Sequence, residues 1–192
     1  MPQYFLTLGE SWGFNINIPT RKFVLGNDYF VTKKYEEKLD HSLLFISSVI
    51  HGETLSKVAI EYAGMFPDIQ IKFKLHPNEY FNEENYKYLF ADYPKIRVLK
   101  NEFELGVLIA RSEIVVLINS TVLYQALDQG AKVAVLKVLN YESQSECFNL
   151  PNVFLFDTVE ELEKAVSAEK KECNVTFFEK FNKDVFNKLI VS

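Results

Sequence analysis

Short apolar segments alternate with amphipathic segments from residue 43 onward, and no other feature of the sequence constrains the fold as strongly. The first apolar segment, Leu43 to Val49, precedes a stretch whose apolar residues recur at helical spacing from Leu55 to Phe66. Further apolar segments occur at 69–76, 96–100, 113–119, 132–138 and 152–156. Strands that alternate with helices pair in parallel through right-handed crossovers. The sequence therefore predicts a Rossmann-like, doubly wound parallel α/β sheet.

The distribution of charge along the expected strands predicts their order in the sheet. Continuous apolar runs are typical of strands covered on both faces, and three segments have them: Leu43 to Ile46, Ile114 to Ile118 and Val133 to Leu136. The segments at 69–75 and 96–100 alternate instead and carry Lys72, Lys74 and Arg97 on one side, which is typical of strands nearer an edge. We expect the order 3-2-1-4-5, with a sixth strand at 152–156.

The ends of the chain do not follow the repeat. Residues 1–40 contain two strand-like segments, YFLTLG and KFVLG, and lead into a charged, linker-like stretch, TKKYEEKLDH. We expect 1–40 to be a linker and the remnant of an amino-terminal half, and 41–192 to be the Rossmann-like domain of a two-domain protein. A last helix, expected at about 176–190 with Phe178, Phe181, Val185 and Leu189 on one face, would pack back on this domain.

The composition excludes several classes of function. A formal net charge of −5 gives no general attraction to nucleic acid, so an anionic ligand needs a local site. Cys147 and Cys173 are the only cysteines, and no Cys/His pattern has the spacing of metal ligands, so we expect reduced thiols, no metal and no cofactor. The sequence has no apolar run long enough to span a bilayer, and the segment PQYFLTLGESW after Met1 has neither the basic nor the apolar region typical of a signal peptide. We therefore expect a cytoplasmic protein.

A histidine and a proline end the second expected strand, in the segment KLHPNEY. A residue before proline is held in extended geometry, so His76-Pro77 ends the strand before a helix can begin. The imidazole would then lie at the rim of the sheet, where it can donate a hydrogen bond to a phosphate or, if protonated, supply a charge. The alternative is that Pro77 only stops the strand and that His76 caps its neighbours.

Hydroxyl and glycine residues follow two other strands, at the edge where open α/β sheets bind ligands. Ser120 and Thr121 follow a buried strand and open a helix, whose free N–H groups can form an anion site; an ordinary helix cap is the alternative. Ser48, His51 and Gly52 follow the first strand. Glycine permits close backbone approach, and His51 either shapes the site or covers the helix start. These strand ends together form one candidate binding site.

Other motifs narrow the choice of ligand. Neither the GxGxxG fingerprint of dinucleotide-binding proteins nor the GxxxxGK[ST] loop of P-loop nucleotidases is present. After the fifth expected strand, Glu142 and Glu146 lie near the same rim, where either could accept hydrogen bonds from a ribose or simply begin a solvated helix. We select Glu142 as a candidate binding residue and assign Asp128 and Asp157 to surface or capping roles.

The segments KLHPNEY and NSTVLYQAL resemble the carboxyl-terminal, donor-binding half of GT-B fold transferases that build bacterial surface polysaccharide. The resemblance is to the capsule and polysialyltransferase-like families and to the CDP-glycerol glycerophosphotransferases, and it covers nearly the whole chain. It implies that His76 and Pro77, with Ser120 and Thr121, bind the phosphate of a CMP- or CDP-linked sugar or glycerol donor. His76 would be the catalytic residue, because it would stabilise the charge that develops on the departing nucleotide.

The same resemblance implies what the intact enzyme needs. In these families the general base lies in the amino-terminal domain, so a chain with only the donor-binding half would bind nucleotide weakly and catalyse little. The polysaccharide acceptor would bind through the amino-terminal domain, and the intact enzyme would associate peripherally with the inner face of the membrane. The resemblance therefore implies a cytoplasmic bacterial glycosyltransferase of capsule biosynthesis.

Two other functions stay open. A noncatalytic Rossmann-like interaction domain would bind a partner protein and no nucleotide. A nucleotide-sugar epimerase of similar topology would need catalytic carboxylates and a second histidine in the same cleft, for which His51 and Glu79 are the candidates.

Overall fold

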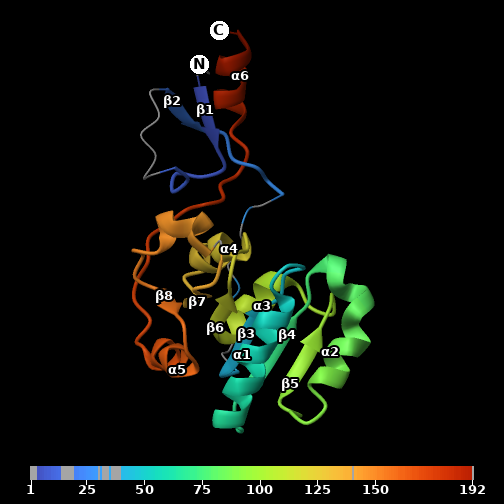
Figure 1. The fold of residues 1–192 in the computed structure, drawn as a ribbon. Coiled ribbons are helices and arrows are strands. Elements are labelled where there is room, and N and C mark those ends of the chain that lie inside the picture. Colours follow the sequence, from blue (N-terminus) through green and yellow to red (C-terminus); the bar gives the residue numbers. More distant parts are fainter. Residues whose placement is uncertain are drawn as a thin grey trace.

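The structure is a computed structural model that describes residues 4–13, 20–29, 31, 35, 40–139 and 141–191. Its main element is a six-stranded parallel sheet in the order β5-β4-β3-β6-β7-β8 (Figure 1). In chain order its strands are β3 (Ser42–Ile46), β4 (Gln70–Lys74), β5 (Ile96–Leu99), β6 (Ser112–Leu117), β7 (Val133–Leu136) and β8 (Val153–Phe156). Counted within this sheet the order is 3-2-1-4-5-6, so the predicted strand order and the doubly wound parallel fold are confirmed.

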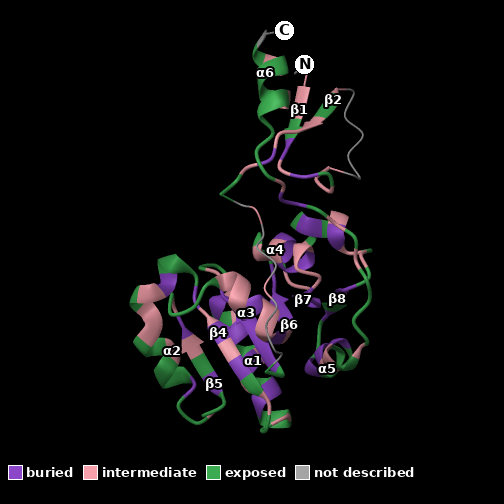
Figure 2. Cartoon of the chain, turned by 180° about the vertical axis from the view of Figure 1, so that it is seen from behind, coloured by how far each residue is buried: buried purple, intermediate pink, exposed green. Residues whose placement is uncertain are grey.

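Helices connect the strands and cover both faces of the sheet. They are α1 (Gly52–Met65), a 3₁₀ helix (Pro77–Asn82), α2 (Glu83–Leu89), α3 (Leu105–Arg111), α4 (Val122–Asp128), a second 3₁₀ segment (Tyr141–Cys147) and α5 (Val159–Ser167). Leu43 and Phe45 of β3 pack with residues of α1 and α5, whereas Leu44 and Ile46 pack with residues of α3 and α4. The sheet thus separates two layers, and its strands β3, β6 and β7 are buried almost throughout (purple in Figure 2). None of the described helices is both long and apolar enough to cross a membrane.

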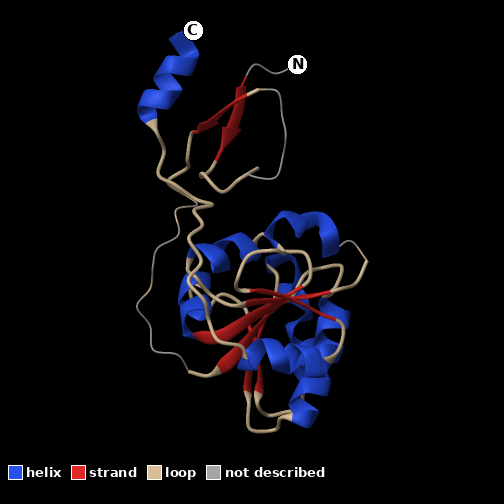
Figure 3. Cartoon of the chain, turned by 90° about the vertical axis from the view of Figure 1, so that its left-hand side faces the viewer, coloured by secondary structure: helices blue, strands red, loops and turns tan. Residues whose placement is uncertain are grey.

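Two short strands near the amino terminus form a sheet of their own. β1 (Tyr4–Thr7) and β2 (Arg21–Val24) pair in parallel, with Tyr4 opposite Arg21. They lie apart from the six-stranded sheet (Figures 1 and 3). The two strands predicted in this region are therefore confirmed. Residues 14–19, between them, and 32–34 and 36–39 of the expected linker lie outside the described residues.

The last helix begins later than predicted and packs elsewhere. α6 spans Lys183–Val191, and it lies beside β1 and β2 rather than on the Rossmann-like domain (Figure 3). Phe177 and Phe178, which we expected at its start, are non-helical core residues. The carboxylate of Asp128 accepts their backbone N–H groups at 2.7 and 3.1 Å, so Asp128 anchors this return segment to α4.

Backbone hydrogen bonds then carry the chain away from the domain. The N–H of Glu179 donates to the carbonyl of Leu8 at 2.8 Å, and the N–H of Asn182 donates to the carbonyl of Leu25 at 2.7 Å. The segment 179–182 before α6 therefore lies alongside Leu8 and Leu25, the residues that follow β1 and β2. This pairing explains why α6 ends beside the small sheet, and the prediction that it packs back on the domain is wrong.

Candidate functional site

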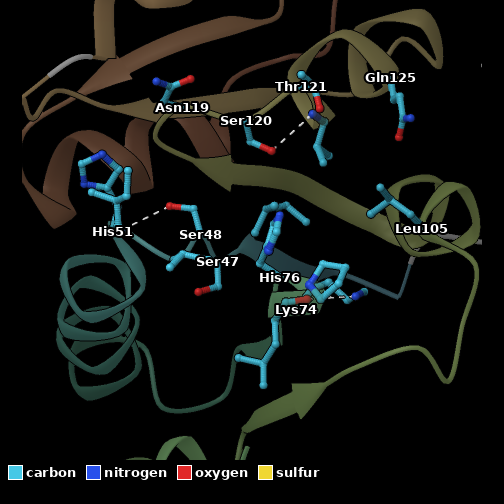
Figure 4. Close-up of a pocket in the computed structure, with 16 residues that line it drawn as sticks. Ser47, Ser48, His51, Lys74, His76, Leu105, Asn119, Ser120, Thr121 and Gln125 are labelled. Atoms are coloured by element: carbon cyan, nitrogen blue, oxygen red, sulfur yellow. Dashed lines mark hydrogen bonds between the residues drawn. The ribbon is translucent and has the colours of Figure 1, made fainter. Parts of the chain in front are cut away.

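A cleft of about 540 Å³ opens at the carboxyl ends of β3, β4 and β6, where the strand order reverses. Open α/β sheets bind ligands at this edge, and the volume suits a small organic molecule. Figure 4 shows the side chains that surround the cleft. The lining consists of Ile46, Ser47, Ser48, Val49, Ile50, His51, Lys74, Leu75, His76, Pro77, Leu105, Asn119, Ser120, Thr121, Val122 and Gln125.

His76 caps the 3₁₀ helix that follows β4. Its backbone is extended, with φ −64° and ψ 145°, as expected for a residue before proline. Its Nδ1 accepts the backbone N–H of Asn78 at 3.2 Å. Because an accepting nitrogen carries no hydrogen, the neutral ring carries its hydrogen on Nε2. His76 therefore caps the helix with one ring nitrogen, as the alternative interpretation predicted, and it also lines the cleft. Binding of a phosphate by His76 stays a prediction.

The buried carboxylate of Glu79 supports this turn. Its Oε2 accepts the backbone N–H of His76 at 3.2 Å, which completes a capping box. Its Oε1 accepts the hydroxyls of Ser47 at 3.1 Å and Tyr86 at 2.7 Å. Only 4% of Glu79 is exposed, and the residue is not part of the cleft lining. Glu79 therefore supports the site from within the protein and does not face a ligand.

The loop after β6 brings Ser120 and Thr121 to the cleft. Ser120 Oγ accepts the N–H of Val122 at 3.3 Å, whereas the side chain of Thr121 makes no capping hydrogen bond. The buried amide of Gln144 holds the Ser120 backbone: its Oε1 accepts the N–H at 3.3 Å, and its Nε2 donates to the carbonyl at 2.8 Å. The sequence pattern drew attention to Glu142 and Glu146, on either side of Gln144, and no motif marked this amide.

The loop after β3 forms another wall of the cleft. Ser48 Oγ accepts the backbone N–H of His51 at 3.2 Å, and both residues line the cleft. Gly52 does not line it: a β-carbon there would lie 2.2 Å from Tyr86 Oη, so Gly52 permits close packing at the start of α1. Glu142 is exposed and also lies outside the lining. Six of the eight residues proposed from the sequence therefore share one cleft.

Lys74 is a cleft residue whose position the sequence analysis did not identify. Its Nζ donates to the carbonyl of Leu75 at 3.0 Å and to the hydroxyl of Tyr80 at 3.3 Å. No carboxylate of the described residues pairs with it, whereas Lys72 on the same strand pairs with Asp40. A partly buried ammonium group without a counter-ion favours an anionic ligand, because burial of an unpaired charge is costly.

The charge of the cleft has one sign. Lys74, His51 and His76 are its basic residues, and no aspartate or glutamate occurs among the lining residues that the structure describes. In the same part of the chain, no group of three or more His, Cys, Asp or Glu side chains could hold a metal ion. The arrangement of hydroxyls, imidazoles and an ammonium group suits an anion.

No protein-family model and no curated protein matches the sequence. Solved structures match its fold. The UDP-GlcNAc 2-epimerase of Methanocaldococcus jannaschii, in complex with UDP-GlcNAc and UDP, superposes with a TM-score of 0.59 at 16% identity, over 90% of this chain and 55% of that one. A second structure of this epimerase gives 0.57 at 18% identity, over 80% and 46%. The glycotransferase of kitacinnamycin gives 0.56 at 13% identity, over 86% and 46%.

These comparisons establish the fold. The matching structures are GT-B fold epimerases and glycosyltransferases, and this chain has the Rossmann-like α/β fold of one half of such a protein. It spans about half the length of the structures that it matches. The Rossmann-like, doubly wound fold predicted from the sequence is thus confirmed, whereas the capsule and polysialyltransferase-like families inferred from the motifs gain no separate support.

Proposed function

We propose that this chain is the donor-binding half of a GT-B glycosyltransferase and that its cleft binds the nucleoside phosphate part of a nucleotide-linked sugar. The observation that carries the proposal is the convergence of Ser48, His76 and Ser120, from three strand ends, on one cleft at the switch point of the sheet. A lining with basic and hydroxyl groups suits a phosphate. One structure of the same fold is a complex with UDP-GlcNAc and UDP, which supports a nucleotide-sugar ligand.

Each polar group has its own part in the proposed site. His76 donates its Nε2–H to a phosphate oxygen and stabilises the charge that develops when the nucleotide departs. The hydroxyls of Ser120 and Thr121 bind the phosphate from the α4 side, and Ser48 and His51 complete the β3 side. Lys74 supplies positive charge. Pro77 restricts His76 to an extended backbone, which agrees with the φ and ψ angles of His76.

The proposal also covers the identity of the donor nucleotide and the place where the acceptor binds. The resemblance of KLHPNEY and NSTVLYQAL to bacterial surface polysaccharide transferases favours a CMP- or CDP-linked donor, and a UDP-linked donor is the competing choice because a structure of this fold binds UDP-GlcNAc. Because the chain spans about half of the matching structures, we assign acceptor binding and turnover to the complete two-domain protein. That protein is proposed to act in capsule synthesis in the bacterial cytoplasm, at the inner face of the membrane.

A nucleotide-sugar epimerase is the second candidate, because two of the matching structures are of such an enzyme. Epimerisation of this kind would use carboxylates as acid and base. Glu79, the candidate from the sequence, is buried, and three donors occupy its oxygens. The cleft geometry therefore favours donor binding over epimerase chemistry by this chain.

Thermal-shift measurements test the proposed function. Wild type, His76→Ala and the control His41→Ala are each melted with CMP, CDP, UMP, UDP, GDP and ADP. His41 is an exposed histidine next to the opposite end of β3, where it contacts Glu113. A ligand that binds only the native state adds about 2.7 kcal/mol at a hundredfold excess over Kd.

The proposal predicts stabilisation by a pyrimidine nucleotide that His76→Ala loses and His41→Ala keeps. Selectivity for cytidine nucleotides would support a CMP- or CDP-linked donor. Selectivity for uridine nucleotides would support the same donor-binding role with a UDP-linked donor. If no nucleotide shifts the melting temperature, or if His76→Ala responds as wild type does, the proposed site is wrong. Interconversion of free nucleotide sugars without an acceptor would favour the epimerase.

A further inference from the structure

One buried carboxylate joins three parts of the fold next to the cleft. Glu79 accepts hydrogen bonds from Ser47 after β3, from His76 after β4 and from Tyr86 in α2. A carboxylate has no hydrogen to donate, so these three donors satisfy it, and no basic side chain of the described residues forms an ion pair with it. The proposed phosphate site does not use Glu79 directly, because Glu79 does not line the cleft.

The surroundings leave this carboxylate little freedom to move. A β-carbon on Gly52 would lie 2.2 Å from Tyr86 Oη, 2.5 Å from Glu79 Oε1 and 2.8 Å from Ser47 Oγ. The first residue of α1 is therefore packed directly against all three polar atoms. Side chains in such close contact keep one arrangement, because any shift creates a clash.

Glu79 controls His76 through the capping box. Its Oε2 holds the backbone N–H of His76, and the same turn brings the N–H of Asn78 to 3.2 Å from His76 Nδ1. Nδ1 can accept this hydrogen bond only when the ring hydrogen is on Nε2. The position of the turn thus decides which nitrogen can donate to a ligand.

We propose that Glu79 is a positioning residue that fixes the His76 imidazole in its Nε2–H tautomer, ready to donate to a phosphate oxygen. The proposal rests on the proposed function for its ligand. Its structural part, the tautomer of His76 in the free protein, can be measured without any ligand.

The chemistry of the cluster suggests the variants. Glu79→Gln keeps an oxygen for the His76 N–H, and the hydroxyls of Ser47 and Tyr86 can accept from the new amide as well as donate. Glu79→Leu removes every acceptor. If Glu79→Leu alone does not fold, Ser47→Ala/Glu79→Leu/Tyr86→Phe replaces the polar partners by apolar groups, which costs less stability than unpaired hydroxyls do. The control is Glu163→Leu, which removes the partner of Tyr62 outside the cleft.

The experiment combines imidazole nitrogen NMR with titration calorimetry against CDP and UDP. The chain has three histidines, so His41→Ala and His51→Ala assign the signals. We expect the Nε2–H tautomer in wild type, Glu79→Gln and Glu163→Leu, with similar affinities. We expect mixed tautomers and an increase in Kd of about tenfold or more in the variants that carry Glu79→Leu.

Two results would overturn the positioning role: a wild-type His76 with its hydrogen on Nδ1, or variants with Glu79→Leu that keep both the wild-type tautomer and the wild-type affinity. The second result would leave the proposed function intact. If wild type binds neither nucleotide while its tautomer still depends on Glu79, the proposed function fails and the positioning of His76 stands.

Discussion

The Nζ of Lys74 lies 5.3 Å from the centre of the Tyr80 ring and 3.3 Å from the Tyr80 hydroxyl. The hydroxyl accepts a hydrogen bond from the ammonium group and so holds it in the wall of the cleft. No carboxylate of the described residues neutralises this charge. Because the chain as a whole has a formal net charge of −5, attraction of a phosphate depends on this local arrangement.

Replacement of Lys74 is therefore expected to weaken nucleotide binding. We expect Lys74→Met to raise the Kd for CDP or UDP by about tenfold, as for loss of a charged hydrogen bond, and to lessen the dependence of Kd on salt. Lys137→Met is the matched control, because Lys137 follows β7 at the same sheet edge and is already paired with Asp157. Calorimetry at two salt concentrations measures both effects. Equal losses in the two variants would mean that Lys74 acts only through total charge.

Gln144 is expected to matter although it does not touch the cleft. Gln144→Leu leaves the N–H and the carbonyl of Ser120 without their side-chain partner, and we expect a loss of about 1–3 kcal/mol in the free energy of unfolding. Nucleotide affinity should fall as well, because the Ser120 loop loses its support. Ser145→Ala, at an exposed neighbour, is the control. Urea unfolding and calorimetry that find no difference between the two variants would contradict this role.

Two glycines of α1 give opposite predictions for the same substitution. Gly52→Ala places a β-carbon within 2.8 Å of three polar side-chain atoms, so overpacking should cost about 1–3 kcal/mol. Gly64→Ala meets no atom within 4 Å and should add up to about 1 kcal/mol, since alanine favours helix. Thermal melts of both variants test the difference. A neutral Gly52→Ala would show that the Ser47, Glu79 and Tyr86 cluster can move.

We expect ionisation of the Tyr86 hydroxyl to lower the free energy of unfolding at alkaline pH. Burial, followed by the hydrogen bond to Glu79, raises the pKa of Tyr86 to about 12. An unfolded tyrosine titrates near pH 10, with a pKa of about 10. The contribution of Tyr86 to the free energy of unfolding is thus constant below about pH 10 and is lost as the pH rises from about 10 to about 12.

Urea unfolding across this pH range, for wild type and Tyr86→Phe, isolates the contribution. Burial also raises the pKa values of Tyr62 and Tyr124, so both proteins should lose stability with rising pH. Wild type should lose more than Tyr86→Phe. Parallel curves for the two proteins would mean that the Tyr86 hydroxyl is not held as the structure describes.

The order of the sheet could be predicted because it depends on local pattern. Continuous apolar segments marked β3, β6 and β7 as central. The alternation of strands with helices indicated parallel pairing, for which crossover connections are right-handed. The same reasoning brought His76 and Ser120 together, because the carboxyl ends of parallel strands meet at one edge.

Residues that act across the fold could not be predicted in this way. Gln144 lies 24 residues from Ser120, and only the path of the chain after β7 brings the two together. The charged side of β4 indicated where Lys72 and Lys74 point, but not that Lys74 reaches the cleft while Lys72 pairs with Asp40. The spacing of Phe178 and Phe181 fits a helix, yet hydrogen bonds to Asp128 and to Asp28 hold their backbones outside one.

NMR can map directly where a nucleotide binds on this chain. Backbone amide spectra of the wild-type protein are recorded during titration with CDP and UDP. We expect the shifted signals to gather after β3, β4 and β6, at Ser48, His76, Ser120 and their neighbours. Shifts that gather elsewhere, for example around Lys87 and Arg97 beside β5, or no shifts with either nucleotide, would contradict this expectation.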